Sequence, residues 1–275
     1  MKPLKPAEIL EAIIETAVTK ASGSFMKLFV LAILAGSFIA FAAQGSNMAA
    51  FNLLADPESY GLGRVLAGAV FATGLMLVVL AGAELFTGNN MMIAAVCEKK
   101  ITFLRMMRNW GIVYLGNFIG SVFIAYMVAH SGLLNNGDGL LGAMTVKIAA
   151  YKSNLPFLSA FYLGIMCNWL VCLAVWIATG ADTAAGKILG IFFPIWLFVT
   201  SGFEHSIANM YYVPAGILVK GNAAFVEISN ITLDALSNLT WIGFFVNNLI
   251  PVTLGNIVGG SILVALAYLY AYKKA

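Results

Sequence analysis

The amino-acid sequence predicts an all-α integral membrane protein with six transmembrane regions, arranged as an inverted three-plus-three repeat. The first observation behind this prediction is composition: 61% of the 275 residues are hydrophobic and only 10% are charged. A soluble domain carries about 25% charged residues, so this chain has too few charges to cover a globular surface. The other two observations are long apolar segments and a pair of polar breaks within them.

Six apolar regions are long enough to cross a bilayer, for which a helix needs about 20 mostly apolar residues. They run over about 26–44, 62–97, 110–129, 157–179, 187–218 and 244–272. The second and fifth regions are too long for one simple span. We therefore expect each of these two to consist of two half-helices joined by a break.

The whole chain, 1–275, is interpreted as a single membrane domain with a short N-terminal addition. Within residues 1–25, charged side chains alternate with paired apolar residues at helical spacing, which predicts an amphipathic interfacial helix. We expect this helix to be an anchor rather than a gate of the cytoplasmic mouth. Residues 26–130 form the first repeat and residues 157–272 the second.

Charge orients these spans. Most lysines and arginines fall in the N-terminal segment, in the loops after the second and fourth regions, and at the C-terminus. The positive-inside rule therefore places both termini in the cytoplasm, with the protein in the cell (inner or plasma) membrane. An even number of spans agrees with this orientation.

Two glutamates lie in the polar breaks, at Glu84 and Glu204, and each is followed five residues later by an asparagine, Asn89 and Asn209. A carboxylate at the bilayer centre costs about 2.5–3.5 kcal/mol even on lenient scales. Irregular backbone survives at this depth only when it is buried in protein or lines a cavity. We expect Glu84, Glu204 and the nearby Asn89, Asn168 and Asn209 to support the broken helices structurally.

A second element is also repeated, because Leu-Gly-Asn occurs at 115–117 and again at 254–256. The two elements appear in the same order in both halves, and each half has three spans. An odd number of spans gives the halves opposite orientations, which is the inverted repeat of many transporters. The glycines of these segments are interpreted as sites of close helix packing.

The breaks also supply candidate pore residues. The N-terminus of a half-helix attracts anions, and Thr87 and His205 add a hydroxyl and an imidazole there. We interpret His205 as functional because it is an ionisable side chain inside the membrane. No metal-ligand cluster, nucleophile elbow, phosphate-binding loop or nucleic-acid patch occurs in the sequence. The sequence therefore predicts no enzyme, no cofactor and no nucleic-acid partner.

At these residues the chain resembles the formate/nitrite transporter family. The matching segments are Gly82–Asn89, Gly164–Ala174, Ser201–Met210 and Asn248–Asn256. The resemblance covers nearly the whole chain, and the Thr-Gly-Asn-Asn loop after Phe86 is most similar to the hydrosulfide ion channel subgroup. Asn-Pro-Ala motifs typical of water channels are absent.

The resemblance implies an aquaporin-like protomer in a homopentamer, with one pore per protomer for small monovalent anions. Thr87 resembles the loop threonine of the family, His205 its central histidine and Lys152 its vestibule lysine. The implied apolar constriction comprises Phe71, Leu75 and Phe198, with Leu85 and Phe86 nearby. Without the resemblance, these apolar residues are ordinary helix core and Lys152 is a solvated loop lysine.

The leading hypothesis is passive transport of a small anion or its conjugate acid, with hydrosulfide favoured over formate and nitrite. His205 either supplies a proton or, as a cation, lowers the barrier to the bare anion. The alternatives are a formate or nitrite channel of the same family, a channel for a small neutral solute, and a non-transporting receptor or scaffold.

Overall fold

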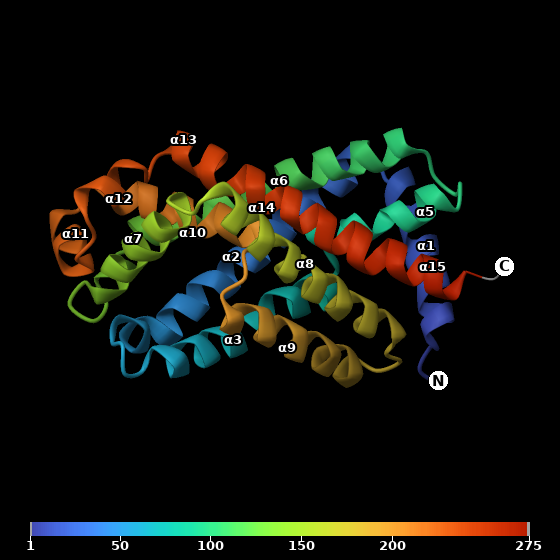
Figure 1. Cartoon of the computed structure of the whole chain (residues 1–275), viewed down its shortest axis with the longest axis horizontal. Helices are drawn as coiled ribbons and strands as arrows, with labels where there is room; N and C mark the ends of the chain where they lie inside the picture. Colours follow the sequence, from blue (N-terminus) through green and yellow to red (C-terminus); the bar gives the residue numbers. More distant parts are fainter. Residues whose placement is uncertain (1, 274–275) are drawn as a thin grey trace.

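The protein was analysed as a computed structural model, which describes residues 2–273. Six helical stretches in it are long and apolar enough to cross a membrane: Phe25–Ala55, Tyr60–Gly82, Phe103–His130, Phe157–Gly180, Ala184–Ser201 and Trp241–Tyr272. They run along the long axis of the molecule, and both termini lie at the same end (Figure 1). The predicted all-α membrane fold with six transmembrane regions is therefore confirmed.

The first half of the chain contains α1 (Pro6–Ser22), α2 (Phe25–Ala55), α3 (Tyr60–Leu77), α4 (Phe86–Asn89), α5 (Ile93–Cys97) and α6 (Phe103–His130). The second half contains α7 (Leu140–Ser153), α8 (Phe157–Gly180), α9 (Ala184–Ser201), α10 (Ser206–Val219), α11 (Ala223–Ser229), α12 (Leu233–Ser237), α13 (Trp241–Gly243), α14 (Ile250–Ile257) and α15 (Ala267–Tyr272). Short η segments complete the helical elements, with η1 at Val78–Gly82, η2 at Asn90–Met92, η3 at Leu133–Asn135, η4 at Phe244–Leu249 and η5 at Val258–Leu266.

Helix α2 extends beyond the predicted end of the first region at residue 44 and continues to Ala55. The polar residues that mark this predicted end are buried within the bundle instead. Ser46 Oγ donates to the carbonyl of Ala67, at 2.9 Å, and Gln44 accepts a hydrogen bond from the Tyr211 hydroxyl. A prediction from hydropathy alone ends this span too early, because these polar side chains have hydrogen-bond partners inside the protein.

Both predicted breaks are present, and both begin at a glycine in the left-handed region. Gly82 has φ of 83° and Gly202 has φ of 82°, a conformation that costs other residues free energy. The backbone then runs extended before α4 and α10 begin. In each break the glutamate N–H donates to a neighbouring helix, from Glu84 to Leu31 O and from Glu204 to Leu163 O, both at 3.2 Å.

The sixth region is one continuous rod, but it contains two π-helical segments, η4 and η5. Sequence periodicity does not predict these segments. π-helical turns often occur at functional sites, and Asn248 lies within η4. Its carboxamide reaches the second break, as described below.

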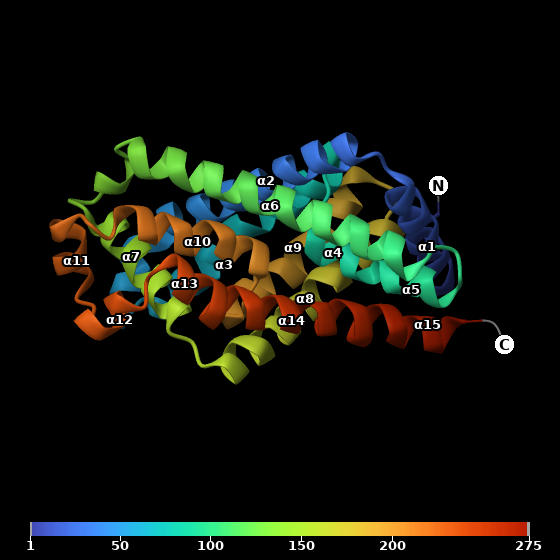
Figure 2. The ribbon, with the colours of Figure 1, turned by 90° about the horizontal axis from the view of Figure 1, so that it is seen from above.

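Helix α1 lies across the end of the bundle that holds the termini (Figure 2). Its apolar residues Ile9, Leu10 and Ile13 are buried in a cluster with Trp176 of α8 and Leu269 of α15. This placement differs from the interfacial anchor that the sequence predicts, because the side chains that would enter lipid are packed on protein.

Each half contains one close helix pair of the same kind. Helix α6 crosses α2 at Gly120, where an added Cβ would lie 2.1 Å from Ile33 O. Helix α14 crosses α8 at Gly255, where an added Cβ would lie 2.2 Å from Phe161 O. Contacts this close need a residue without a side chain, so the glycine packing that the repeat predicts is present in both halves.

We predict that Gly120→Ala destabilises the protein by about 1–3 kcal/mol, because the new methyl group overpacks α2 against α6. Gly111 is the matched control in the same helix, since an added Cβ there meets nothing within 4 Å. Thermal unfolding of the purified protein in detergent measures both variants. Equal unfolding temperatures for Gly120→Ala and Gly111→Ala would contradict the packing argument.

Candidate functional site

Two cavities approach the centre of the bundle from opposite ends. The α7 cavity, about 110 Å³, is lined by residues that include Arg64, Phe71, Lys152, Phe198 and His205. The α1 cavity, about 430 Å³, is lined on the side of the termini by residues that include Lys20, Lys27, Leu75, Glu84 and Leu85. The two linings have no residue in common, so the two cavities do not join at the centre.

Thr87 and His205 lie at this centre. Thr87 Oγ1 lies 3.1 Å from His205 Nε2, and the two residues are 0% and 3% exposed. The imidazole stacks on Phe198 at 6.0 Å between ring centroids, and Phe198 meets Phe71 edge-on at 5.7 Å. The polar pair that the sequence singles out is thus assembled from the two breaks.

The second ring nitrogen of His205 determines its tautomer. His205 is the N-cap of α10, and its Nδ1 accepts a hydrogen bond from the Ala208 N–H at 3.1 Å. Because Nδ1 is an acceptor here, the proton of the neutral ring is on Nε2 and points at the Thr87 hydroxyl. An imidazolium would lose this N-cap bond, so the geometry favours neutral histidine.

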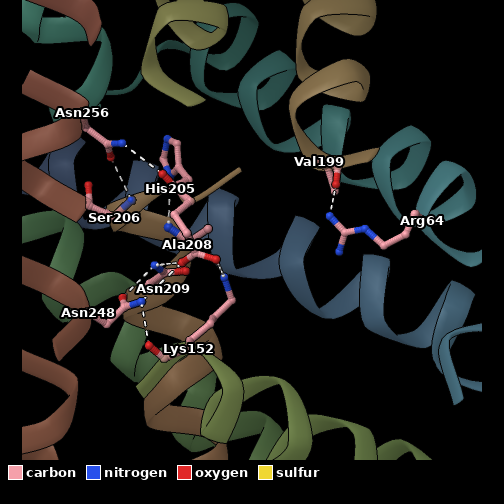
Figure 3. A network of polar contacts seen from close by, with 10 residues as sticks. Arg64, Lys152, Val199, His205, Ser206, Ala208, Asn209, Asn248 and Asn256 are labelled. Atoms are coloured by element: carbon pink, nitrogen blue, oxygen red, sulfur yellow. Dashed lines mark hydrogen bonds and ion pairs between the residues drawn. The ribbon is translucent and has the colours of Figure 1, made fainter. Parts of the chain in front are cut away.

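Glu204 is buried in a network that accounts for its charge. Figure 3 shows the Lys152, Asn209 and Asn248 side chains that belong to this network. Lys152 Nζ lies 2.8 Å from Glu204 Oε1. The Asn209 carboxamide donates to Glu204 Oε2 at 2.6 Å, and that of Asn248 donates to the same oxygen at 3.3 Å. A buried carboxylate is tolerated when it is paired and hydrogen-bonded in this way.

Glu84 has a matching network at the other break. Lys20 Nζ lies 3.2 Å from Glu84 Oε2, and the Asn89 carboxamide donates to the same oxygen at 2.8 Å. Asn89 also donates to Asn109 Oδ1 at 2.9 Å, as Asn209 does to Asn248 Oδ1 at 2.7 Å. Each half therefore uses lysine, glutamate and two asparagines in the same arrangement.

The asparagines of the repeated Leu-Gly-Asn elements hold the start of each second half-helix. Asn117 accepts from the Phe86 N–H at 2.9 Å and donates to Glu84 O at 2.9 Å. Asn256 accepts from the Ser206 N–H at 2.9 Å and donates to Glu204 O at 3.0 Å. These bonds satisfy backbone groups that a broken helix leaves free.

Asn168 connects the two halves at the centre. Its carboxamide nitrogen lies within hydrogen-bond distance of Thr87 O (3.2 Å), Asn90 Oδ1 (2.9 Å) and Asn256 O (2.7 Å). This position fits the supporting role that the sequence predicts for Asn168. It also holds the backbone of Thr87, and hence the Thr87 hydroxyl, next to His205.

The structure differs from one expectation from the sequence. Phe86 does not line either cavity; it packs on Trp110 and Tyr114 at 5.7 and 4.8 Å and lines a lateral groove. The other four residues of the expected constriction border the path, with Phe71 and Phe198 in the α7 cavity and Leu75 and Leu85 in the α1 cavity.

Lys152 is in the last turn of α7 and lines the α7 cavity, and its side chain is only 12% exposed. This excludes the solvated loop lysine that is expected without the family resemblance.

Lys20 and Arg64 are charged residues of the cavities that the sequence interpretation missed. A signal for Lys20 does exist: it precedes Leu31 by the same number of residues as Lys152 precedes Leu163, and Leu31 and Leu163 are equivalent acceptors. Arg64 has no counterpart in the repeat, so only the fold identifies it.

Comparison with known proteins identifies relatives along nearly the whole chain. The family model described as "Formate/nitrite transporter" matches residues 7–270. A "Probable formate transporter" from Methanothermobacter thermautotrophicus is 42% identical, with 98% of this chain and 97% of that protein covered. The "Formate channel FocA" of Escherichia coli (strain K12) is 36% identical, with 98% and 95% covered.

Solved structures agree with this result. A "Pentameric formate channel with formate bound" superposes with a TM-score of 0.80 at 38% identity, covering 91% of this chain and 98% of that one. An "FNT family ion channel" gives a TM-score of 0.79 at 28% identity, covering 96% and 98%. These relatives are named as channels and transporters and not as enzymes. The fold, the two broken helices and the sequence relatives together show that the chain belongs to the formate/nitrite transporter family.

Proposed function

We propose that the protein is a passive channel for small monovalent anions or their conjugate acids, with formate as the leading substrate. The observation that carries this proposal is the Thr87–His205 pair, closed between two cavities that each contain lysine. We further propose that the protomers assemble as a homopentamer with one pore each, because a relative of this fold is pentameric. We also propose that both termini lie in the cytoplasm, on the basis of the positive-inside rule.

The path alternates between charge and apolar surface. A cation in each cavity raises the local concentration of anions, while Phe71 and Phe198 on one side and Leu75 and Leu85 on the other oppose a hydrated charge. His205 Nε2–H and the Thr87 hydroxyl are the polar groups between these two pairs. A small anion that loses its water there meets these two donors.

Neutral His205 favours passage of the conjugate acid over attraction of the bare anion by an imidazolium. Water in the cavity supplies the proton, because a neutral imidazole that gave up its Nε2–H would be left as an imidazolate. The weak acid crosses the apolar pairs more easily without charge, and His205 Nε2–H and the Thr87 hydroxyl hydrogen-bond to it between these pairs. Of the two roles that the sequence leaves open for His205, the imidazolium is therefore disfavoured.

Formate replaces hydrosulfide as the leading substrate. The expected hydrosulfide preference depends on the Thr-Gly-Asn-Asn loop, but Asn90 of that loop is fully buried and contacts Asn168 and Ser261 rather than either cavity. Several relatives are named as formate channels or transporters. Their names also disfavour the receptor or scaffold alternative.

A competition panel in proteoliposomes tests the substrate. We expect uptake of labelled formate to be inhibited by unlabelled formate and nitrite more strongly than by hydrosulfide or chloride. Stronger inhibition by hydrosulfide than by formate would restore the original preference, and osmotic swelling without acid or anion uptake would support a neutral-solute channel instead.

We predict that His205→Asn reduces formate uptake about tenfold or more, because loss of a buried hydrogen-bond partner costs about 1–3 kcal/mol. Asparagine is a good N-cap, so the break should persist while the imidazole donor is lost. Uptake by the wild type should rise as external pH falls, because more of the substrate is then the conjugate acid, and the variant should take up less at every pH. The exposed His130→Asn is the control; unchanged uptake in His205→Asn would refute the role of His205.

We predict that Lys152→Met lowers stability by about 3–5 kcal/mol, because it leaves Glu204 buried without its cation. The double variant Lys152→Met/Glu204→Gln should recover most of this loss, since both charges are removed together. Thermal unfolding in detergent measures the cycle, and Lys273→Met at the exposed Lys273–Glu98 pair is the control. If the single and double variants unfold alike, the ion pair has no structural role.

A further inference from the structure

Arg64 places a second cation in the α7 cavity, separate from Lys152. It lies on α3, is half-buried, and lines the cavity together with Phe198 and His205. Figure 3 shows its guanidinium beside the end of α9 and apart from the cluster around Lys152. Its Nη2 donates to Val199 O, and its Nε to Thr200 O at 3.4 Å.

These two bonds use only one edge of the guanidinium. A guanidinium has five N–H donors in a planar fork, and Nε and Nη2 point to the same side. Among residues 2–273, no hydrogen bond to protein involves Nη1. The end of the fork formed by Nη1 and Nη2 is therefore free to bind two acceptor atoms, and the α9 carbonyls hold the group in place.

The charge of Arg64 also differs from that of Lys152. Lys152 forms an ion pair with Glu204 at 2.8 Å, which cancels most of its field. Arg64 belongs to none of the ion pairs found between described residues. Within the α7 cavity, the net positive charge that an anion meets is therefore supplied by Arg64.

Asn47 provides an independent sign of an unfilled polar site. It lines the α7 cavity from α2 and is only 4% exposed. Its carboxamide nitrogen has no hydrogen-bond partner among the described residues, although buried polar groups are normally satisfied. A ligand acceptor in the cavity would provide the missing partner.

We propose that Arg64 and Asn47 form a receiving site for a planar monovalent anion with two oxygens, such as a small carboxylate or nitrite, at the α7 end of the pore. The site lies before the Phe71–Phe198 pair and is distinct from Thr87 and His205. This proposal rests on the proposed function and adds a selectivity step to it.

The shape of the fork makes the site selective. Two parallel N–H groups match a carboxylate bidentately, which adds geometric specificity to charge attraction. Hydrosulfide and chloride carry the same charge on a single atom and gain only the attraction. Arg64 therefore favours formate over these anions, whereas a lysine at this position would not.

The test uses two preparations of sealed vesicles, in which the α7 end of the protein faces either outward or inward. Initial formate uptake is measured in each over a range of formate concentrations. For entry from the α7 side, Arg64→Gln should raise the KM for formate about three- to tenfold, because the charge that concentrates the anion is lost. Compared with Arg64→Gln, Arg64→Lys should recover much of the dependence of the formate KM on ionic strength. It should not recover the preference for formate over chloride and hydrosulfide. Asn47→Ala should raise the formate KM without changing that for chloride.

Lys147→Gln is the matched control, because Lys147 lies on α7, is exposed, and does not line the cavity. Formate-dependent thermal stabilisation of the detergent-purified protein gives a second readout, and Arg64→Gln should weaken it. A lower maximal rate and lower unfolding temperature in Arg64→Gln, with KM and selectivity unchanged, would mean that Arg64 only caps α9 and would overturn the proposal. Absence of formate uptake by the wild type would instead overturn the proposed function.

Discussion

The structure depends on one constraint: the polar groups of two broken helices must be satisfied inside the membrane. Each break exposes backbone groups that a continuous helix would pair. Glu84 and Glu204 are central to how this is achieved. Each carboxylate forms an ion pair with a lysine and accepts a hydrogen bond from an asparagine carboxamide. Asn117 and Asn256 then pair the backbone on either side of the break. We call these two lysine–glutamate–asparagine networks, together with Asn117 and Asn256, the frame. The frame fixes the backbone of both breaks and thereby the positions of Thr87 and His205.

The frame is symmetric, but the residues at its centre are not. The position of His205 in the second break corresponds to Leu85 in the first, and that of Thr87 corresponds to Ile207. One break thus contributes the imidazole and the other the hydroxyl, while their counterparts are apolar. A symmetric pair of histidines would place two ionisable rings together at low dielectric, which favours neither their charge nor their packing. The asymmetry leaves a single polar pair, one imidazole and one hydroxyl, between apolar neighbours.

Much of this frame could be predicted from sequence, because its causes are local. Helix-breaking glycines, carboxylates within apolar runs and a repeated spacing identify both breaks and the meeting of Thr87 with His205. Other features depend on tertiary packing. The direction of Phe86 is determined by Trp110 and Tyr114 of α6, and the approach of Lys20 to Glu84 requires α1 to pack on the bundle. Neither can be derived from periodicity, and hydropathy likewise misses buried polar residues such as Ser46.

The distribution of charge connects the frame to conduction. In each cavity the lysine of the frame is paired with a glutamate, so its field is largely cancelled. One further cation remains on each side, Arg64 in the α7 cavity and Lys27 in the α1 cavity. Both ends therefore attract anions, as the proposed passive pathway requires. Lys27 is exposed and its field is screened by salt, whereas Arg64 is half-buried and fixed by carbonyls, so its attraction is stronger at physiological ionic strength. In the proposed pathway, selection by shape therefore occurs at the α7 end, while the α1 end concentrates anions by charge.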